Sequence, residues 1–194
     1  MSKDSILEAA AAIFSQKGYH AASMQDIAQA VQLRKASLYY HVNSKQEILL
    51  ALLDKGLDLL IAEMQEVMAQ PHPPDEKLRL AVRTYLQTML DHRALASVLL
   101  LEHRSLEPEL RARHITRRDR FESLWRDLIQ DGVEAGVFKA SDPSIESKAL
   151  LGVLNWTITW YRPEGTHSPE DIADRFTYLF LYGLVPREEV VSKA

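Results

Sequence analysis

Apolar residues recur along this chain at the three- and four-residue spacing of helices, and no stretch alternates long enough to predict a strand. Ile6, Ala10 and Phe14, for example, share one helix face, and Gly18 ends that helix. The pattern therefore predicts an all-α protein of about nine helices. We expect them over residues 6–17, 24–31, 34–42, 45–68, 78–89, 95–103, 108–131, 143–162 and 169–183.

Helix start signals strengthen several of these predictions. Ser23 with Asp26 is a variant of the capping box, and Ser44 with Glu47 is a strict one. Residues 70–74 are rich in proline and are expected to form a connector. We predict two domains, a small head over 1–46 and a larger body over 47–194.

Composition narrows the class of protein. The chain has 194 residues, 46% of them hydrophobic and 26% charged, which is typical of a globular protein. Its longest apolar runs have six residues, whereas a membrane span needs about 20. No signal peptide is evident, and there is no cysteine, so we expect a cytoplasmic protein without disulfides.

Charge is divided unevenly along the chain. Residues 1–47 hold five Lys or Arg against four Asp or Glu, a net charge of +1, while the whole chain carries −4. An acidic chain is not expected to wrap nucleic acid without specificity. A small, locally basic head that binds DNA remains compatible with this balance.

The two short helices over 23–42 follow a supporting helix, which is the plan of a helix-turn-helix unit. Leu38 and Val42 are expected to face the core of the head. The other side chains suit phosphates and base edges, namely Arg34, Lys35, Ser37, Tyr39, Tyr40 and His41. Ser23 and Lys45 stand at helix N-termini, where phosphates bind readily. Spacing alone leaves an alternative open, in which the aromatic residues lie on the surface of an ordinary helical bundle.

The stretches SMQDIA at 23–28 and LYYHVNSKQEIL at 38–49 resemble the DNA-binding head of the TetR family of transcriptional regulators. The chain departs from the family pattern at Gln32, Arg34 and Ala36, where glycine, serine and glycine are usual. The resemblance implies a homodimer that binds double-stranded DNA at an inverted-repeat operator and is released by a small-molecule effector. On this basis Ser23, Tyr39, Tyr40, His41 and Lys45 are expected to anchor phosphates, while Arg34, Lys35 and Ser37 read bases.

The last two predicted helices are apolar on two faces, so each must be buried on two sides. The body offers few other helices to cover both faces, which predicts a second copy of the chain as the cover. A fully buried central helix is the alternative. The predicted dimer residues are Leu151, Leu154, Ile158, Tyr161, Phe176, Tyr178, Phe180 and Leu181.

Polar side chains lie on the apolar stripes of the body, which suggests a ligand site. Arg117 and His114 stand beside Phe121 in the helix over 108–131, within a cluster of six arginines over 104–120. Arginine matches phosphate and carboxylate oxygens, so an anionic effector is one interpretation, and ion pairs within the protein are the other. The predicted ligand residues are His103, His114, Arg117, Phe121, Asn155, Trp156 and Trp160.

The stretch NWTITWYRPEG at 155–165, with SPEDIA at 168–173, is similar to TetR regulators that respond to acyl-coenzyme A (acyl-CoA) thioesters. The resemblance implies such an effector, and packing of the tryptophans in a dimer core is the alternative. No esterase elbow, phosphate-binding glycine loop or zinc-protease motif occurs, so we expect no enzyme, cofactor or metal. A dimeric ligand-binding protein without DNA function is the competing hypothesis.

Overall fold

The computed structural model describes residues 2–139 and 142–183, and over these residues the chain is helical with no strand. The predicted all-α fold is confirmed. The end of the predicted body, over 184–194, lies outside the described residues. The elements are α1 (Lys3–Lys17), α2 (Met24–Ala30), α3 (Lys35–His41), α4 (Lys45–Ala69), α5 (Pro74–Asp91), α6 (Arg93–Leu101), the 3₁₀ helix η1 (His103–Ser105), α7 (Pro108–Glu134), α8 (Pro143–Trp160) and α9 (Pro169–Tyr182).

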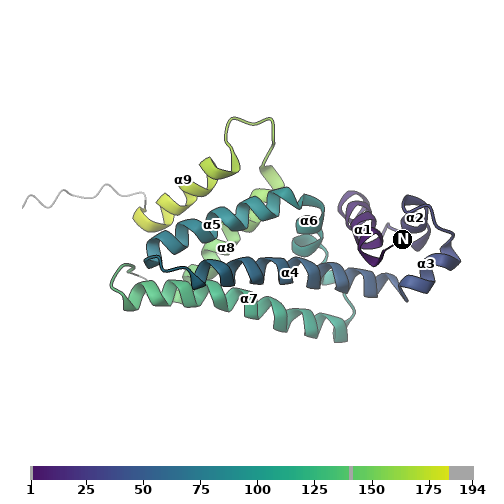
Figure 1. Ribbon diagram of the computed structural model, residues 1–194, viewed down its shortest axis with the longest axis horizontal. Helices are drawn as coiled ribbons and strands as arrows, with labels where there is room; N and C mark the ends of the chain where they lie inside the picture. The colour runs from purple at the N-terminus through teal and green to yellow at the C-terminus, as the bar shows by residue number, and fades with distance from the viewer. Residues whose placement is uncertain (1, 140–141, 184–194) are drawn as a thin grey trace, which may run out of the picture.

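The helices form a small head and a larger body joined by one long helix (Figure 1). Helices α1 to α3 make the head, and α4 leaves it and runs along the body against α5, α6 and α7. Helix α8 packs on α7 and α5, and α9 lies on α5. The predicted boundary at 46 falls in the first turn of α4, so a continuous helix connects the two parts.

Helix α4 occupies the centre because residues 48–53 form an unbroken apolar run, which makes this part of the helix apolar on every side. Ile48, Leu49, Leu52 and Leu53 are each at most 1% exposed, so they contact head and body from different faces of one helix. Burying side chains of this size stabilises the fold by about 1.5–3 kcal/mol each. A movement of α4 is therefore coupled to the packing of both parts.

The predicted caps form with one variation. The Ser23 hydroxyl accepts from the Asp26 amide at 3.1 Å, and the Asp26 carboxylate accepts from the Ser23 amide at 2.8 Å. At α4 the Ser44 hydroxyl accepts from the Glu47 amide at 3.0 Å, as predicted. The Glu47 carboxylate instead accepts from the amide of Asn43, at 2.8 Å.

Several predicted boundaries shift. Helix α5 begins at Pro74, inside the expected connector, because proline suits a first helical position that needs no N–H donor. The helix expected to reach His103 ends at Leu101, and the chain continues as η1. After α7 the chain turns at Gly136, whose φ is +70°, and Phe138 packs over Gly132.

The candidate DNA-binding head and ligand cavity

Helices α2 and α3 form the predicted pair, held by a tight turn. Leu38 and Val42 are buried at 0% and 1% exposure, as their positions predicted. Gln32 takes a φ of +56° in the turn, and the next amide, of Leu33, donates to Ala28 O at 2.8 Å. A non-glycine residue rarely adopts this φ, so the departure from the usual glycine at Gln32 carries a conformational cost.

The outer side of α3 presents polar and aromatic side chains to solvent. Arg34, Lys35, Ser37 and Tyr39 are exposed, and Tyr40 is 88% exposed. Arg34 takes the N-cap position of α3 without a side-chain cap bond. In residues 2–139 and 142–183 neither Arg34 nor Lys35 forms an ion pair. The two cations and the aromatic rings therefore form one accessible face.

Two predicted phosphate anchors have partners inside the head. The Ser23 hydroxyl serves as the N-cap of α2 and also donates to Asp26 at 2.7 Å. The Lys45 ammonium donates to Tyr19 O at 2.9 Å and to Ala22 O at 2.8 Å, and it lies 4.3 Å from the centre of the Tyr19 ring. Within the single chain Lys45 therefore ties α4 to the loop between α1 and α2, and its contact with phosphate stays a prediction.

A polar junction connects α4 to η1 and the start of α7. The Gln46 amide nitrogen donates to Ser105 O at 2.9 Å, and its amide oxygen accepts from the Glu107 amide at 3.0 Å. The Ser105 hydroxyl lies 3.2 Å from Nε2 of His20, in the head. Since η1 also contains His103, this junction joins the head to the interior of the body.

A cavity of about 440 Å³ lies inside the body among α4, α5, α6, α7 and α8. Its volume falls within the range of about 300–1,000 Å³ typical of small-molecule sites. Most of its wall is apolar, formed by Leu57, Leu60, Leu99, Leu100, Phe121 and Leu151. The arrangement suits a ligand with a hydrocarbon part.

Polar side chains interrupt this apolar wall. The Tyr85 hydroxyl donates to the side-chain oxygen of Asn155, and burial raises the pKa of Tyr85. Burial lowers the pKa of His103, and it lowers that of His114 to about 4, with the nearby charges of His103 and Arg118 adding to the effect. The rings of the two histidines lie 6.1 Å apart. These groups are neutral near pH 7.

Charged side chains stand at the solvent-facing rim of the cavity. Arg118 and Lys148 keep about half of their side chains exposed, and the Lys148 ammonium lies 2.8 Å from the Glu122 carboxylate. Arg118 pairs with Asp119 at 3.0 Å through one guanidinium nitrogen. The guanidinium therefore keeps donors for an anionic group of a ligand.

The cavity contains four of the seven predicted ligand residues: His103, His114, Phe121 and Asn155. Arg117 does not line it but pairs with Asp58 and, at 3.2 Å, with Asp54 on α4, which is the ion-pair alternative. Sequence reasoning missed Arg118 and Lys148. Arg118 follows His114 by one helical turn, a spacing that could have placed it on the cavity side of α7.

The two apolar faces of α8 are arranged opposite to the expectation. Leu151, Leu154 and Tyr161, predicted for the dimer interface, are at most 9% exposed within the single chain, and Ile158 is half-buried. Trp156 and Trp160, predicted for the ligand site, are 66% and 44% exposed and do not line the cavity. The spacing shows two faces but not which of them the rest of the chain covers.

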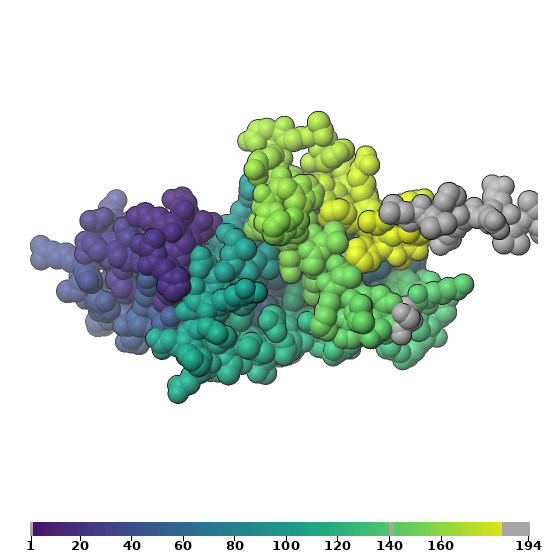
Figure 2. Space-filling model, turned by 180° about the vertical axis from the view of Figure 1, so that it is seen from behind, coloured from purple at the N-terminus to yellow at the C-terminus, as the bar shows by residue number. Residues whose placement is uncertain are grey.

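Helix α9 carries further aromatic side chains, one of which contacts Trp160. Tyr178 is 61% exposed, Trp160 contacts Phe176 with ring centres 6.3 Å apart, and Phe180 and Leu181 are half-buried. Figure 2 shows α8 and α9 reaching the surface on the same side of the body. We call Trp156, Trp160 and Tyr178 the aromatic face.

An accessible helix-turn-helix face, connected by α4 to a body that encloses a ligand-sized cavity, defines the class of ligand-responsive DNA-binding regulators. Comparison with known families identifies the family of regulators to which the chain belongs. Residues 6–52 match the family described as bacterial regulatory proteins, tetR family, and residues 71–184 match the tetracyclin repressor-like C-terminal domain. The chain belongs to the TetR family and is a ligand-responsive transcriptional regulator.

Individual relatives agree with this assignment. The transcriptional repressor KstR2 of Mycobacterium tuberculosis is 26% identical over 181 residues, 92% of this chain and 90% of KstR2. The TetR-family regulator PfmR of Thermus thermophilus is 38% identical and superposes with a TM-score of 0.86, over 93% of this chain and 99% of PfmR. AibR, solved with isovaleryl coenzyme A and operator DNA, is 29% identical with a TM-score of 0.84, over 92% of this chain and 97% of AibR.

No helix within the described ranges combines the length and the apolar character needed to cross a membrane.

Proposed function

We propose that the protein is a homodimeric repressor that binds an inverted-repeat operator in the cytoplasm and leaves it when an acyl-CoA thioester fills the cavity. One observation carries the proposal: the exposed face of α3 and the cavity are joined by a single helix, α4, and by the η1 junction. Binding in the body therefore has a structural route to the head.

The roles on DNA follow from the chemistry of each side chain. Lys35 and Arg34 supply cations for base edges in the major groove, while the Tyr39 and Tyr40 hydroxyls donate to phosphates. We expect Lys35→Ala to reduce the ratio of operator affinity to scrambled-DNA affinity. Tyr40→Phe should weaken both affinities equally and leave that ratio unchanged. If both variants reduced the ratio to the same extent, the division into base-reading and phosphate-binding residues would be contradicted.

The aromatic face supports the homodimer. Trp156 and Trp160 expose large apolar surfaces one turn apart on α8, and Tyr178 exposes another on α9. Exposed apolar surface of this size marks an interaction site. A symmetric dimer buries the same patch from both copies. Such a dimer also places two α3 helices on one DNA duplex, as an inverted repeat requires.

The cavity and its rim support an acyl-CoA effector. Apolar walls suit the acyl chain, and Arg118 and Lys148 at the rim suit the anionic part of the thioester. The similarity to AibR, whose structure contains isovaleryl coenzyme A, points to the same class of ligand.

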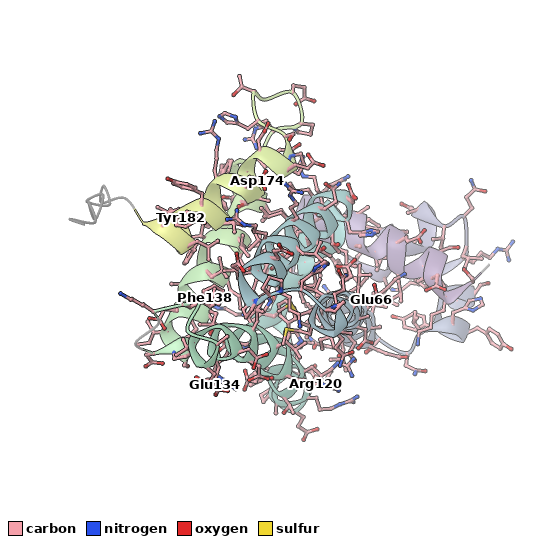
Figure 3. The ribbon with its side chains drawn as sticks, turned by 60° about the vertical axis from the view of Figure 1, so that its left-hand side comes forward. Glu66, Arg120, Glu134, Phe138, Asp174 and Tyr182 are labelled. Atoms are coloured by element: carbon pink, nitrogen blue, oxygen red, sulfur yellow. The ribbon has the colours of Figure 1, made fainter. Side chains whose placement is uncertain are left out.

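Calorimetric titration with a panel of acyl-CoA thioesters tests this assignment. We expect Arg118→Gln to weaken acyl-CoA binding about tenfold or more, consistent with the loss of a charged hydrogen bond. Arg120→Gln removes the same charge from an exposed position on α7 outside the cavity wall and should bind normally (Figure 3). Equal affinities of the two variants, or no binding of any acyl-CoA by the native protein, would contradict the proposal.

The junction of Gln46 with Ser105 and Glu107 provides the route for release. A ligand that displaces His103 moves η1, and the two hydrogen bonds of Gln46 transmit the shift to the first turn of α4. We expect Gln46→Ala to bind operator and acyl-CoA within about threefold of the native protein but to release DNA poorly. Gln65→Ala, an exposed change on the same helix, should release DNA normally.

A further inference from the structure

The cavity holds an amide whose hydrogen-bonding capacity is only half used. The Tyr85 hydroxyl donates to the side-chain oxygen of Asn155, an arrangement that turns the amide nitrogen of Asn155 away from Tyr85. Across residues 2–139 and 142–183 this nitrogen donates to no acceptor, although Asn155 lines the cavity. Its two N–H donors are therefore available to a bound molecule.

A second polar group on a different wall of the cavity also has no partner. His114, on α7, lines the cavity and is 2% exposed, and its Nδ1 atom is buried without a hydrogen-bond partner within the described part of the chain. A buried polar atom that bonds to nothing reduces the stability of the folded chain. A ligand oxygen that reaches this atom supplies the missing partner.

These groups select a neutral oxygen over a charged one. His114 is neutral at pH 7, because burial lowers its pKa to about 4, and burial of Tyr85 keeps its hydroxyl protonated. A carboxylate beside them would lose its hydration among neutral groups and near the carboxylate of Glu122, which lines the same cavity and already pairs with Lys148. The cations Arg118 and Lys148 stand at the rim, where about half of each side chain is exposed.

We propose that the effector carries a hydroxyl or keto oxygen on the part enclosed by the cavity, recognised by Asn155 and His114. The proposal rests on the acyl-CoA effector proposed above and specifies its class: an oxygenated acyl thioester rather than a saturated or a dicarboxylic one. Tyr85 acts as a positioning residue, because its hydrogen bond fixes which end of the Asn155 amide faces the cavity.

The test compares four thioesters with the same six-carbon chain on the native protein by calorimetric titration: hexanoyl-CoA, 3-hydroxyhexanoyl-CoA, 5-oxohexanoyl-CoA and adipoyl-CoA. We expect at least one of the hydroxy and keto compounds to bind about tenfold more tightly than hexanoyl-CoA, the gain typical of a newly satisfied buried hydrogen bond. Adipoyl-CoA should bind most weakly, because its terminal carboxylate is charged.

The outcomes separate the two proposals. Binding of hexanoyl-CoA as tight as that of both oxygenated compounds overturns the recognition of oxygen and leaves the acyl-CoA effector in place. Tightest binding of adipoyl-CoA overturns the selection of a neutral group. Failure of all four to bind overturns the acyl-CoA effector and this inference with it.

Two variants assign the preference to the named residues. His114→Phe keeps the ring volume, and the double variant Tyr85→Phe/Asn155→Leu removes both partners of one hydrogen bond together, so neither is left unsatisfied. Each should reduce the preference for the oxygenated thioester over hexanoyl-CoA at least threefold, and circular dichroism with thermal melts checks that the variants fold. An undiminished preference in both variants would overturn the assignment.

Discussion

The aromatic face yields a prediction whose size follows from the structure. Trp156 exposes 66% of its surface, which for a side chain of about 250 Å² is about 165 Å². Burial of that area in a dimer is worth about 4 kcal/mol per copy at 25 cal/mol per Å². We therefore expect Trp156→Ala to weaken the dimer by about 2–4 kcal/mol for each copy, the range of an interface hot spot.

Because a symmetric dimer contains the residue twice, the total loss is about 4–8 kcal/mol. Each 1.4 kcal/mol corresponds to a tenfold change, so the dissociation constant of the dimer should rise at least about a thousandfold. Sedimentation equilibrium over a range of protein concentrations measures this constant directly. The single chain itself should keep its thermal stability, since Trp156 contributes little to the core.

Tyr40→Ala is the matched control, because Tyr40 is an aromatic residue with 88% exposure in the head, away from the aromatic face. This variant should remain as dimeric as the native protein. A Trp156→Ala variant that dissociates no more readily than Tyr40→Ala would refute the placement of the interface. A monomeric native protein at high concentration would refute the dimer itself.

Four further predictions follow from individual contacts. Lys45→Ala should lower the free energy of unfolding by about 1–3 kcal/mol, because two charged hydrogen bonds are lost. It should leave the salt dependence of DNA binding unchanged. A flatter salt dependence would show instead that Lys45 contacts a phosphate. Arg34→Ser should add a cap to α3 and raise stability by about 1 kcal/mol while weakening operator binding, as thermal melts and anisotropy titrations can show together. Gly132→Ala should lower stability by about 1–3 kcal/mol, because the added Cβ overlaps the ring of Phe138, and adding Phe138→Ala should recover part of the loss in denaturant titrations. The free energy of unfolding should fall as pH falls from 6.5 to about 4, because in this range the unfolded chain protonates His114 and the folded chain does not. Thermal melts at several pH values should show a flatter pH dependence for His114→Phe. The pH dependence that remains in this variant is expected to come from His103, whose pKa is also lowered.

Much of the fold was predictable because its signals are local. The Ser23 capping box and the glycine that ends α1 act over a single turn, so the sequence contains everything needed to locate them. Register within a helix was also predictable: Leu38 and Val42 face the core as expected. The short η1 was not predicted, because its local backbone bonds are supplemented by Gln46, which lies 59 residues from Ser105 in the sequence.

The site was less predictable because its composition depends on packing between helices. Arg117 and Arg118 are neighbours in the sequence, yet one pairs with Asp54 and Asp58 on α4 and the other borders the cavity. The spacing from His114 favours Arg118 for the cavity side, but only the position of α4 shows that Arg117 is paired. The two faces of α8 were likewise not distinguished by the sequence, because spacing cannot tell which apolar face meets α5 and α7 and which stays exposed.

The central claim is that filling the cavity releases the head from DNA. Fluorescence anisotropy with DNA from immediately upstream of the protein's own gene, at two salt concentrations and with or without a mixed acyl-CoA pool, tests it most directly. We predict tight, salt-sensitive binding that the pool abolishes in the native protein and fails to abolish in Gln46→Ala. Tight binding that the pool leaves intact in the native protein would contradict the claim, and failure to select any DNA from a random library would favour a ligand-binding protein without a DNA function.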